Sequence, residues 1–232
     1  MQHLKIWKYL SAPWVGFSIF FFISFLALAF LQNISESFLT SALISKLLIN
    51  TISLTALVGF FTVIIAAPFA IITSLYKFPC HHFFSWSLSL PLAFPAYIYA
   101  FIFVGGLEYS GPLATWLREF EVILPSVRNI LGASLIMSLA LYPYIFLLMK
   151  AQIKYLGIPI FKAAKTLGKS DITVIRTILL PALKPAIIAG MILAMLETLA
   201  DFGGVSTLRI ETFTVAIYNA WFGYQDYFSG AR

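Results

Sequence analysis

Long uninterrupted apolar runs alternate with shorter polar segments along the whole chain. Five runs stand out, at Trp14–Leu31, Leu47–Tyr76, Phe83–Leu107, Ile130–Met149 and Pro185–Leu208. Each can cross the roughly 30 Å hydrocarbon layer as a helix that satisfies its own backbone hydrogen bonds. A transmembrane barrel would instead show short segments of alternating hydrophobicity. The pattern therefore predicts an all-α integral membrane protein with five transmembrane helices in this chain.

Composition narrows the class further. Apolar residues make up 61% of the 232 residues and charged residues only 10%, against about 25% charged in an ordinary soluble domain. Low charge and high hydrophobicity exclude an intrinsically disordered chain. Cys80 is the only cysteine, which excludes a disulfide-stapled secreted domain.

The first run has two interpretations. Lys5 and Lys8 precede it, and Ala27–Ala29 (A-L-A) could pass for a signal-peptide cleavage site. The run is longer than a usual signal core, however, and four more spans follow it. An uncleaved membrane anchor is the favoured interpretation.

The distribution of basic residues predicts the orientation. Cytoplasmic loops are enriched in lysine and arginine, so we place the N-terminus in the cytoplasm. The cytoplasmic side then holds Lys5, Lys8, Lys77, Lys150, Lys154, Lys162, Lys165, Lys169, Arg176 and Lys184, and the outer side before the C-terminal residue holds Lys46, Arg118, Arg128 and Arg209. The net charge of +6 therefore reflects topology rather than nucleic-acid binding.

The outer segment Glu108–Arg128 differs from the other connections because its polarity is mixed. Gly111-Pro112 resembles the start of a short helix, and Trp116 and Leu117 stand beside Arg118. We expect a small interfacial helix in contact with membrane lipid on the outer surface.

The longest polar stretch, Lys150–Lys184, contains a recognisable local pattern. Gly168 stands where a helix would end in a left-handed turn, and Ser170 and Asp171 can cap a second helix, Ile172–Leu180. The pattern predicts a helix, a glycine turn and a second helix on the cytoplasmic surface. Such a hairpin can dock into a groove of a soluble partner.

Three residues of this stretch, Gly168-Lys169-Ser170, match only the last positions of a phosphate-binding loop motif. The full pattern needs a glycine at position 163 and a preceding strand. The chain has Ala163 instead, so nucleotide binding by this chain is disfavoured.

Residues 162–181 resemble the EAA loop of ABC importer permeases, written E-A-A-x3-G-x9-I-x-L-P. The matching positions are Ala163, Ala164, Gly168, Ile178, Leu180 and Pro181, whereas Lys162 stands where the family has glutamate. The resemblance implies that these seven positions form the surface on which the ATPase docks. The lysine reverses the charge at one of them, which implies altered or weaker docking.

Other segments are similar to the N-terminal half of ferric-iron importer permeases, which carry two such halves in one polypeptide. The most telling are Leu196–Gly203 (L-E-T-L-A-D-F-G) and Ile217–Gly223 (I-Y-N-A-W-F-G). The resemblance covers about residues 45–228. It implies a MetI-like helical bundle in two parts: an N-terminal helix with its periplasmic connection (1–45), and a permease core (46–232). Five spans leave the C-terminus outside, so we expect that a sixth span is missing after Arg232.

The family resemblance also implies a mechanism and a set of partners. A periplasmic binding protein would deliver substrate to a permease in the bacterial inner membrane. Two cytoplasmic ATPase subunits would bind the ATP and dock on the EAA loops, and a second permease half, fused or separate, would complete the pore. The permease itself would perform no chemistry and need no cofactor or metal of its own. Ferric iron is the leading substrate, and thiamine, polyamines or another small solute are the alternatives.

Two carboxylates and two tyrosines are candidates for the translocation pathway. Glu197 and Asp201 are four residues apart, hence on one face of the last span. Charged side chains within a membrane usually face a cavity or a partner, although pairing with Arg209 or with another chain is equally compatible. Tyr97 and Tyr142 could line the pore, or could anchor helices at headgroup level.

Two other functions and one metal cluster are disfavoured. A secondary transporter should show ionisable residues at mid-membrane, and here they gather at the ends of the runs. A membrane-embedded enzyme would need a nucleophile–base pair or a metalloprotease helix, and the sequence has neither. The adjacent residues Cys80-His81-His82 favour a short polar turn, since three neighbouring residues rarely converge on one ion.

Overall fold

The computed structural model describes residues 13, 16, 17, 19, 20, 23, 24 and 41–223. It forms two structural units, residues 1–47 with 215–232, and residues 48–214. Within the described part every regular element is helical, as the sequence predicts. The predicted first span, Trp14–Leu31, falls largely outside the described residues.

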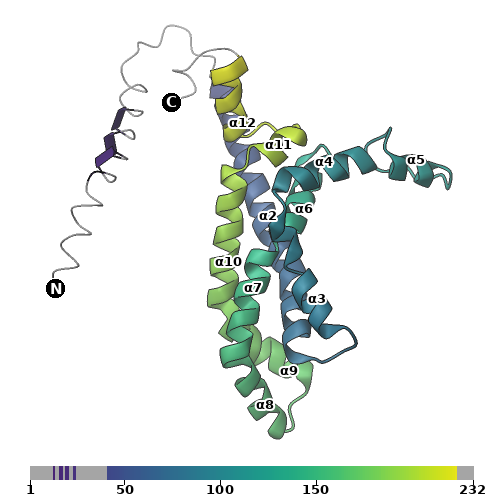
Figure 1. Cartoon of the computed structure of the whole chain (residues 1–232), viewed down its shortest axis with the longest axis vertical. Coiled ribbons are helices and arrows are strands. Elements are labelled where there is room, and N and C mark those ends of the chain that lie inside the picture. Colours follow the sequence, from purple (N-terminus) through teal and green to yellow (C-terminus); the bar gives the residue numbers. More distant parts are fainter. Residues whose placement is uncertain (1–12, 14–15, 18, 21–22, 25–40, 224–232) are drawn as a thin grey trace. The chain divides into compact units, whose positions relative to one another are not determined.

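Most helices follow one another with short connections, and a longer segment, residues 119–129, joins α5 to α6 (Figure 1). In chain order they are α2 (Ser41–Leu75), α3 (His81–Ser87), the 3₁₀ helix η1 (Leu90–Ala93), α4 (Ala96–Leu107), α5 (Pro112–Arg118), α6 (Ile130–Leu141), α7 (Pro143–Gln152), the π-helical turn η2 (Ile153–Gly157), α8 (Ile158–Thr166), α9 (Asp171–Val174), the π-helical turn η3 (Ile175–Leu179), α10 (Leu180–Ala200), α11 (Gly203–Thr207), α12 (Phe213–Tyr218) and the π-helical turn η4 (Asn219–Gly223).

Three helical stretches of the described chain are long and apolar enough to span a membrane: Ser41–Leu75, Ile130–Thr166 and Asp171–Ala200. They correspond to the second, fourth and fifth predicted spans. The middle stretch continues well beyond its predicted end at Met149, because α7, η2 and α8 form one helical path. The predicted short helix after Gly168 likewise runs on into the last span without a break. Local π-helical widening is one way in which a membrane helix accommodates a proline, and η3 ends at Leu179, two residues before Pro181.

The third predicted span, Phe83–Leu107, is broken rather than straight. The stretches His81–Ala93 and Ala96–Arg118 are bent by 94°, so they make a fourth span only if taken together. Phe94 between them is extended, at φ −113° and ψ 133°. The cause is Pro95, which disfavours a helical conformation in the residue before it and has no N–H to continue the helix.

The last predicted span also ends earlier than expected. Helix α10 stops at Ala200 instead of Leu208, because Asp201 adopts an extended conformation, at φ −72° and ψ 124°. The separate helix α11 follows.

The small outer helix predicted within Glu108–Arg128 is present as α5, with Gly111 as its N-cap and Pro112 in its first turn.

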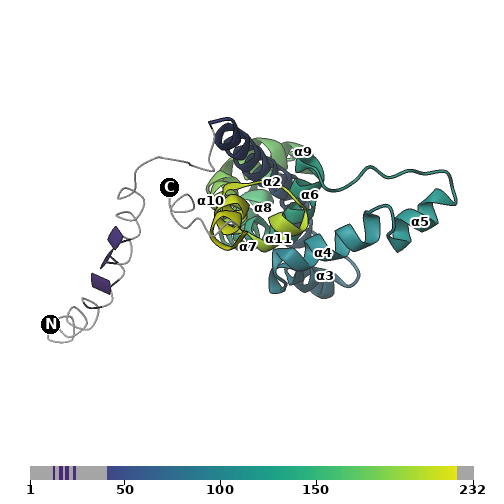
Figure 2. The same ribbon diagram turned by 90° about the horizontal axis from the view of Figure 1, so that it is seen from above.

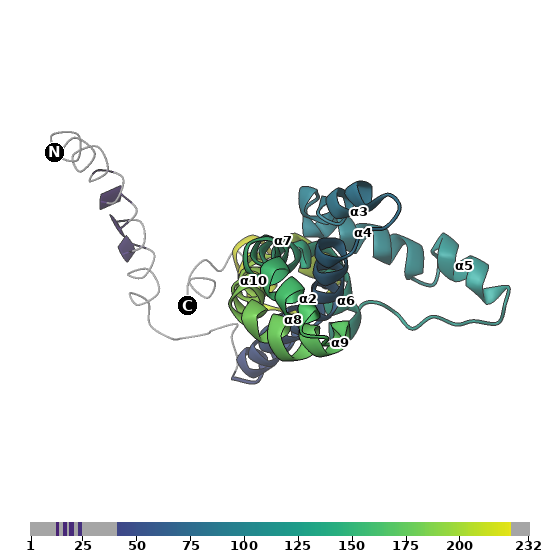
Figure 3. The ribbon, with the colours of Figure 1, turned by 90° about the horizontal axis from the view of Figure 1, so that it is seen from below.

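The core of the larger unit lies between α2, α7 and α10, which run side by side (Figures 1 and 3). Its buried members are Ala66, Ala70 and Ile71 of α2, Tyr142, Ile145, Phe146, Met149 and Ile153 around α7, and Leu179, Leu183 and Ala186 at the start of α10. The long hydrophobic side chains of α7 are thus enclosed by small residues of α2 and by leucines of the α10 path.

Small and polar residues allow these helices to approach closely, as is usual between membrane helices. A Cβ atom on Gly190 of α10 would lie only 2.6 Å from the Cα atom of Ile145 on α7. The buried hydroxyl of Ser138 on α6 donates a hydrogen bond to the carbonyl of Val58 on α2, at 3.3 Å. Backbone contact at Gly190 therefore sets the separation of α7 and α10.

We predict that Gly190→Ala destabilises the bundle, because the new methyl group would meet backbone atoms that have no rotamer in which to escape. The expected loss is roughly 1–3 kcal/mol of unfolding free energy, typical of overpacking. Thermal unfolding of the purified protein in detergent measures it. Gly105→Ala in α4 is the matched control, since nothing lies within 4 Å of a Cβ there. Equal melting of both variants would contradict the packing account.

Candidate functional site

The α8–α9 hairpin, residues 158–174, has the local structure that its sequence predicts. Gly168 takes a left-handed φ of +74°, and its N–H donates to the carbonyl of Lys165 at 3.0 Å. Two residues later the Ser170 hydroxyl accepts a hydrogen bond from the Thr173 N–H at 3.3 Å and caps α9. The predicted glycine turn and serine cap are confirmed.

A polar cluster fixes the hairpin to the end of α2. Lys165 of α8 forms an ion pair with Oδ1 of Asp171, the first residue of α9. The hydroxyl of Tyr76, just after α2, donates to Oδ2 of the same carboxylate at 2.8 Å. This hydrogen bond to a carboxylate is the main cause that raises the pKa of the Tyr76 phenol above its usual value. Asp171 thereby joins three segments at once.

The base of the hairpin is marked by two π-helical turns, η2 before α8 and η3 after α9. They touch each other, since a Cβ on Gly157 of η2 would lie 2.8 Å from the Cδ1 atom of Leu179 on η3. Leu179 is completely buried there. Single π-helical turns occur frequently at functional sites, and this pair lies where the hairpin leaves the packed bundle.

The predicted docking positions divide between the surface and the interior. Lys162, Ala163, Gly168, Ile178 and Pro181 are exposed, Leu180 is partly buried, and Ala164 is buried. Ala164 therefore packs the hairpin, while the five exposed positions face outward.

Two exposed apolar side chains at the tip were not among the predicted positions. Leu167 is 78% exposed and Ile172 is 65% exposed, on either side of the turn. The sequence carried a signal for them, since apolar residues flank a polar turn. Lys169, also exposed, lies between them in the turn. The tip is therefore apolar with a basic residue in it, a surface suited to a groove in another protein.

The carboxylates Glu197 and Asp201 lie at the opposite end of the bundle from the hairpin (Figure 1). Glu197 is exposed on α10. The Asp201 N–H closes the last turn by donating to the Glu197 carbonyl at 2.9 Å, and its Oδ2 atom accepts from the Val205 N–H at 3.0 Å. Asp201 therefore caps α11. The ion pairs among the described residues do not join it to Arg209.

The two candidate tyrosines lie in different surroundings. Tyr97 on α4 is half exposed and packs against α11, since a Cβ on Gly203 would lie 3.0 Å from its Cβ atom. Tyr142 is only 6% exposed, and its ring centroid lies 6.1 Å from that of Phe69 on α2. The structure thus brings Tyr97 near Asp201 through α11 and leaves Tyr142 in the core.

In the turn Cys80-His81-His82, His81 contacts the nearby end of α2. His81 Nε2 lies 2.7 Å from the carbonyl oxygen of Thr73, and Cys80 has a left-handed φ of 59°. In the part of the chain that the structure describes, no three histidine, cysteine or acidic side chains gather where they could hold a metal ion.

We predict that Tyr76→Phe and Asp171→Asn each loosen the hairpin, because each removes a link between α2, α8 and α9. The expected result is faster hydrogen–deuterium exchange at the amides of residues 165–175, with unchanged exchange in α7 and α10. Lys169→Gln is the control, since it removes an exposed cation from the same turn without touching the cluster. Exchange as slow as in the unmodified protein would show that the cluster does not hold the hairpin.

Comparison with known proteins identifies the family and the fold of this chain. Residues 66–221 match the family described as "Binding-protein-dependent transport system inner membrane component". The chain is similar in structure to a subunit of a bacterial alginate ABC transporter solved in complex with a periplasmic protein carrying alginate pentasaccharide. The TM-score is 0.74 at 17% identity, over 99% of this chain and 87% of that one.

Curated relatives come from several transport systems. A Fe(3+)-transport system permease protein of Haemophilus influenzae is 29% identical over 76% of this chain and 32% of its own length. A sulfate transport system permease protein of Salmonella typhimurium is 27% identical over 56% of this chain and 46% of its length. The chain thus spans less than half the length of these relatives. Because the family match covers more than half of the chain, including α7, α10 and the hairpin, the protein belongs to the inner membrane components of binding-protein-dependent transport systems.

Proposed function

We propose that this chain is a permease part of a bacterial ABC importer, and that the α8–α9 hairpin is the place where the ATPase docks. The observation that carries the proposal is the hairpin itself. It keeps the EAA spacing from Ala163 to Pro181, it presents Leu167 and Ile172 to solvent, and both of its arms continue into membrane-spanning helices.

The proposed division of labour follows from this arrangement. ATP is bound and hydrolysed by a pair of cytoplasmic ATPase subunits, so this chain is a transport subunit and not an enzyme. A periplasmic binding protein delivers the substrate to the end of the bundle that carries Asp201. A second permease half, fused or separate, completes the pathway. A solved structural neighbour is itself in complex with a ligand-bound periplasmic protein, which supports this partner.

Ferric iron is the substrate that we propose. Support comes from the Haemophilus Fe(3+) relative, whose match extends over 76% of the chain, against 56% for the sulfate relative. A molybdenum transport system permease of Haemophilus influenzae matches the same share of the chain as the sulfate relative. Because sulfate and molybdate are both oxyanions, an oxyanion is the second candidate. Uptake of radiolabelled ferric iron, sulfate and molybdate by cells with and without the complete transporter separates these two classes.

We predict that Gly168→Asp abolishes co-purification of the ATPase with the complete permease. An aspartate would have to adopt the left-handed conformation of the turn, at a cost of roughly 1–2 kcal/mol, and would place a negative charge next to Lys169 in an exposed turn. A pull-down of the tagged permease from membranes measures the effect. Undiminished ATPase recovery would contradict docking at the hairpin.

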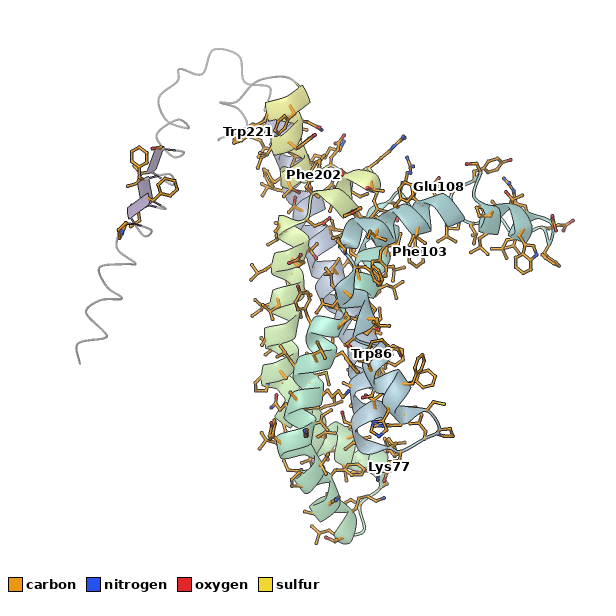
Figure 4. The ribbon with its side chains drawn as sticks, viewed as in Figure 1. Lys77, Trp86, Phe103, Glu108, Phe202 and Trp221 are labelled. Carbon is orange, nitrogen blue, oxygen red and sulfur yellow. The ribbon has the colours of Figure 1, made fainter. Side chains whose placement is uncertain are left out.

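The same pull-down tests the departure at Lys162. Lys162→Glu restores the family residue on an exposed surface and is expected to bind the ATPase more tightly. Lys77→Glu is the control, because it makes the same charge reversal at an exposed position that precedes α3 (Figure 4). A gain that appears equally in both variants would be a general charge effect.

We predict that Asp201→Asn lowers uptake without lowering the amount of permease in the membrane, if the carboxylate charge acts on the substrate pathway. The amide oxygen of asparagine can still accept the Val205 N–H, so the cap on α11 survives. Asp201→Ala removes charge and cap together and should also reduce the amount of folded protein. Unchanged uptake by Asp201→Asn would assign Asp201 to capping alone.

A further inference from the structure

A small cavity lies where α4, α5 and the segment after α5 meet. Its volume is about 220 Å³, and its wall is largely apolar, with Leu107, Ala114, Ile123 and Leu124 around the side chains of Glu108 and Arg118. Figure 4 shows Glu108 at the end of α4, and Figures 1 and 2 show that α5 lies beyond it, away from α7 and α10. The cavity is therefore separate from the hairpin and from the α10–α11 junction.

The cavity holds a guanidinium group that the described chain leaves partly unsatisfied. Arg118 Nη2 donates to the Thr115 hydroxyl at 3.0 Å, and the guanidinium carbon lies 3.9 Å from the centre of the Tyr109 ring. Nη1 is buried and has no hydrogen-bond partner among the described residues. A buried donor without an acceptor is costly, so this N–H is placed for an acceptor from outside the chain.

The carboxylate of Glu108, which also lines the cavity, already has other partners. Glu108 Oε1 accepts the Ser126 hydroxyl at 2.7 Å and lies 3.6 Å from Arg128 Nε. Glu108 and Arg128 thus form an ion pair, and the ion pairs among the described residues do not include Arg118. A guanidinium with free N–H groups in an apolar pocket fits a phosphate or carboxylate oxygen, which it binds through charge-assisted hydrogen bonds.

The surroundings of the cavity favour a lipid as the source of that anion. Tyr109 is 77% exposed and Ile123 is 81% exposed, and Trp116 and Phe120 are exposed beside them. Exposed tyrosine and tryptophan side chains are enriched where membrane proteins meet the headgroup layer. An anionic headgroup above an apolar wall is the chemistry that a phospholipid offers.

We propose that Arg118 binds the phosphate group of an outer-leaflet phospholipid, with the start of an acyl chain along the apolar wall of the cavity. The bound lipid would fix α5 at headgroup depth and satisfy the buried Nη1 donor. This inference depends on the orientation of the chain but not on ATPase docking or on the transported substrate.

The test is the number of phospholipid molecules retained by the purified complete transporter after exchange into detergent with dioleoyl-phosphatidylglycerol, counted by native mass spectrometry. Arg118→Gln is expected to weaken retention of one lipid roughly tenfold, the effect of losing a charge-assisted pair. Arg118→Lys should keep part of it, because the charge remains. Arg209→Gln is the matched control, since it removes an arginine from the same predicted face but away from the cavity. Equal retention by Arg118→Gln and the unmodified protein would overturn the proposal.

Two further arms separate the lipid from other anions. Ten-millimolar inorganic phosphate should not displace the lipid, and displacement would reassign the cavity to soluble anions. In vesicles that contain brominated phosphatidylglycerol, Trp116 fluorescence should be quenched, as judged from the difference between the unmodified protein and Trp116→Phe. Absence of that quenching, together with loss of binding-protein association in Arg118→Gln, would assign the cavity to a protein carboxylate and overturn the lipid proposal. Thermal unfolding of Arg118→Lys shows whether the fold is intact.

Discussion

The backbone contact between α7 and α10 is the constraint on which the rest of the structure depends. Gly190 lets the two helices approach until a single additional carbon atom would clash with Ile145. That approach encloses Phe146 and Leu183 together with the small residues of α2. Since packed interiors are close to crystalline density, the three helices can move only as a unit or by repacking.

The position of the hairpin depends on this contact between α7 and α10. Helix α8 is the continuation of α7, and α9 leads directly into α10, so a force on the turn at Gly168 reaches the bundle through both arms. The contact between Gly157 and Leu179 closes the base, and the Tyr76–Asp171 hydrogen bond adds α2. The two π-helical turns lie at the boundary between the hairpin and the packed core, where a helix with widened hydrogen bonding is easiest to bend. This arrangement is suited to transmit movement from a soluble partner into a membrane bundle.

Features encoded over a few neighbouring residues could be predicted from the sequence, and features made by distant residues could not. Apolar runs located three helices that are long and apolar enough to span a membrane. Gly168 and Ser170 located the hairpin turn and its cap, because each depends on local conformational preference. Pro91 and Pro95 were visible, but a proline in a membrane helix can either be absorbed or break it, and only the packed structure shows the break at Phe94. The link from Tyr76 to Asp171 joins residues 95 positions apart, so no local pattern could reveal it. The capping role of Asp201 was missed for a related reason, since α11 is a short helix with no periodic signal.

Site-directed crosslinking tests the central claim, docking of the ATPase on the hairpin tip, most directly. Cys80 is the only cysteine, so Cys80→Ser gives a background in which one new thiol reports one position. With a short thiol-to-amine crosslinker in membranes that hold the whole transporter, Leu167→Cys should capture the ATPase, and Leu113→Cys on α5 should not. We predict that Leu167→Cys captures the ATPase, and that the capture weakens when detergent disrupts the complex. Absence of capture from Leu167→Cys, with the ATPase present and transport active, would contradict the account.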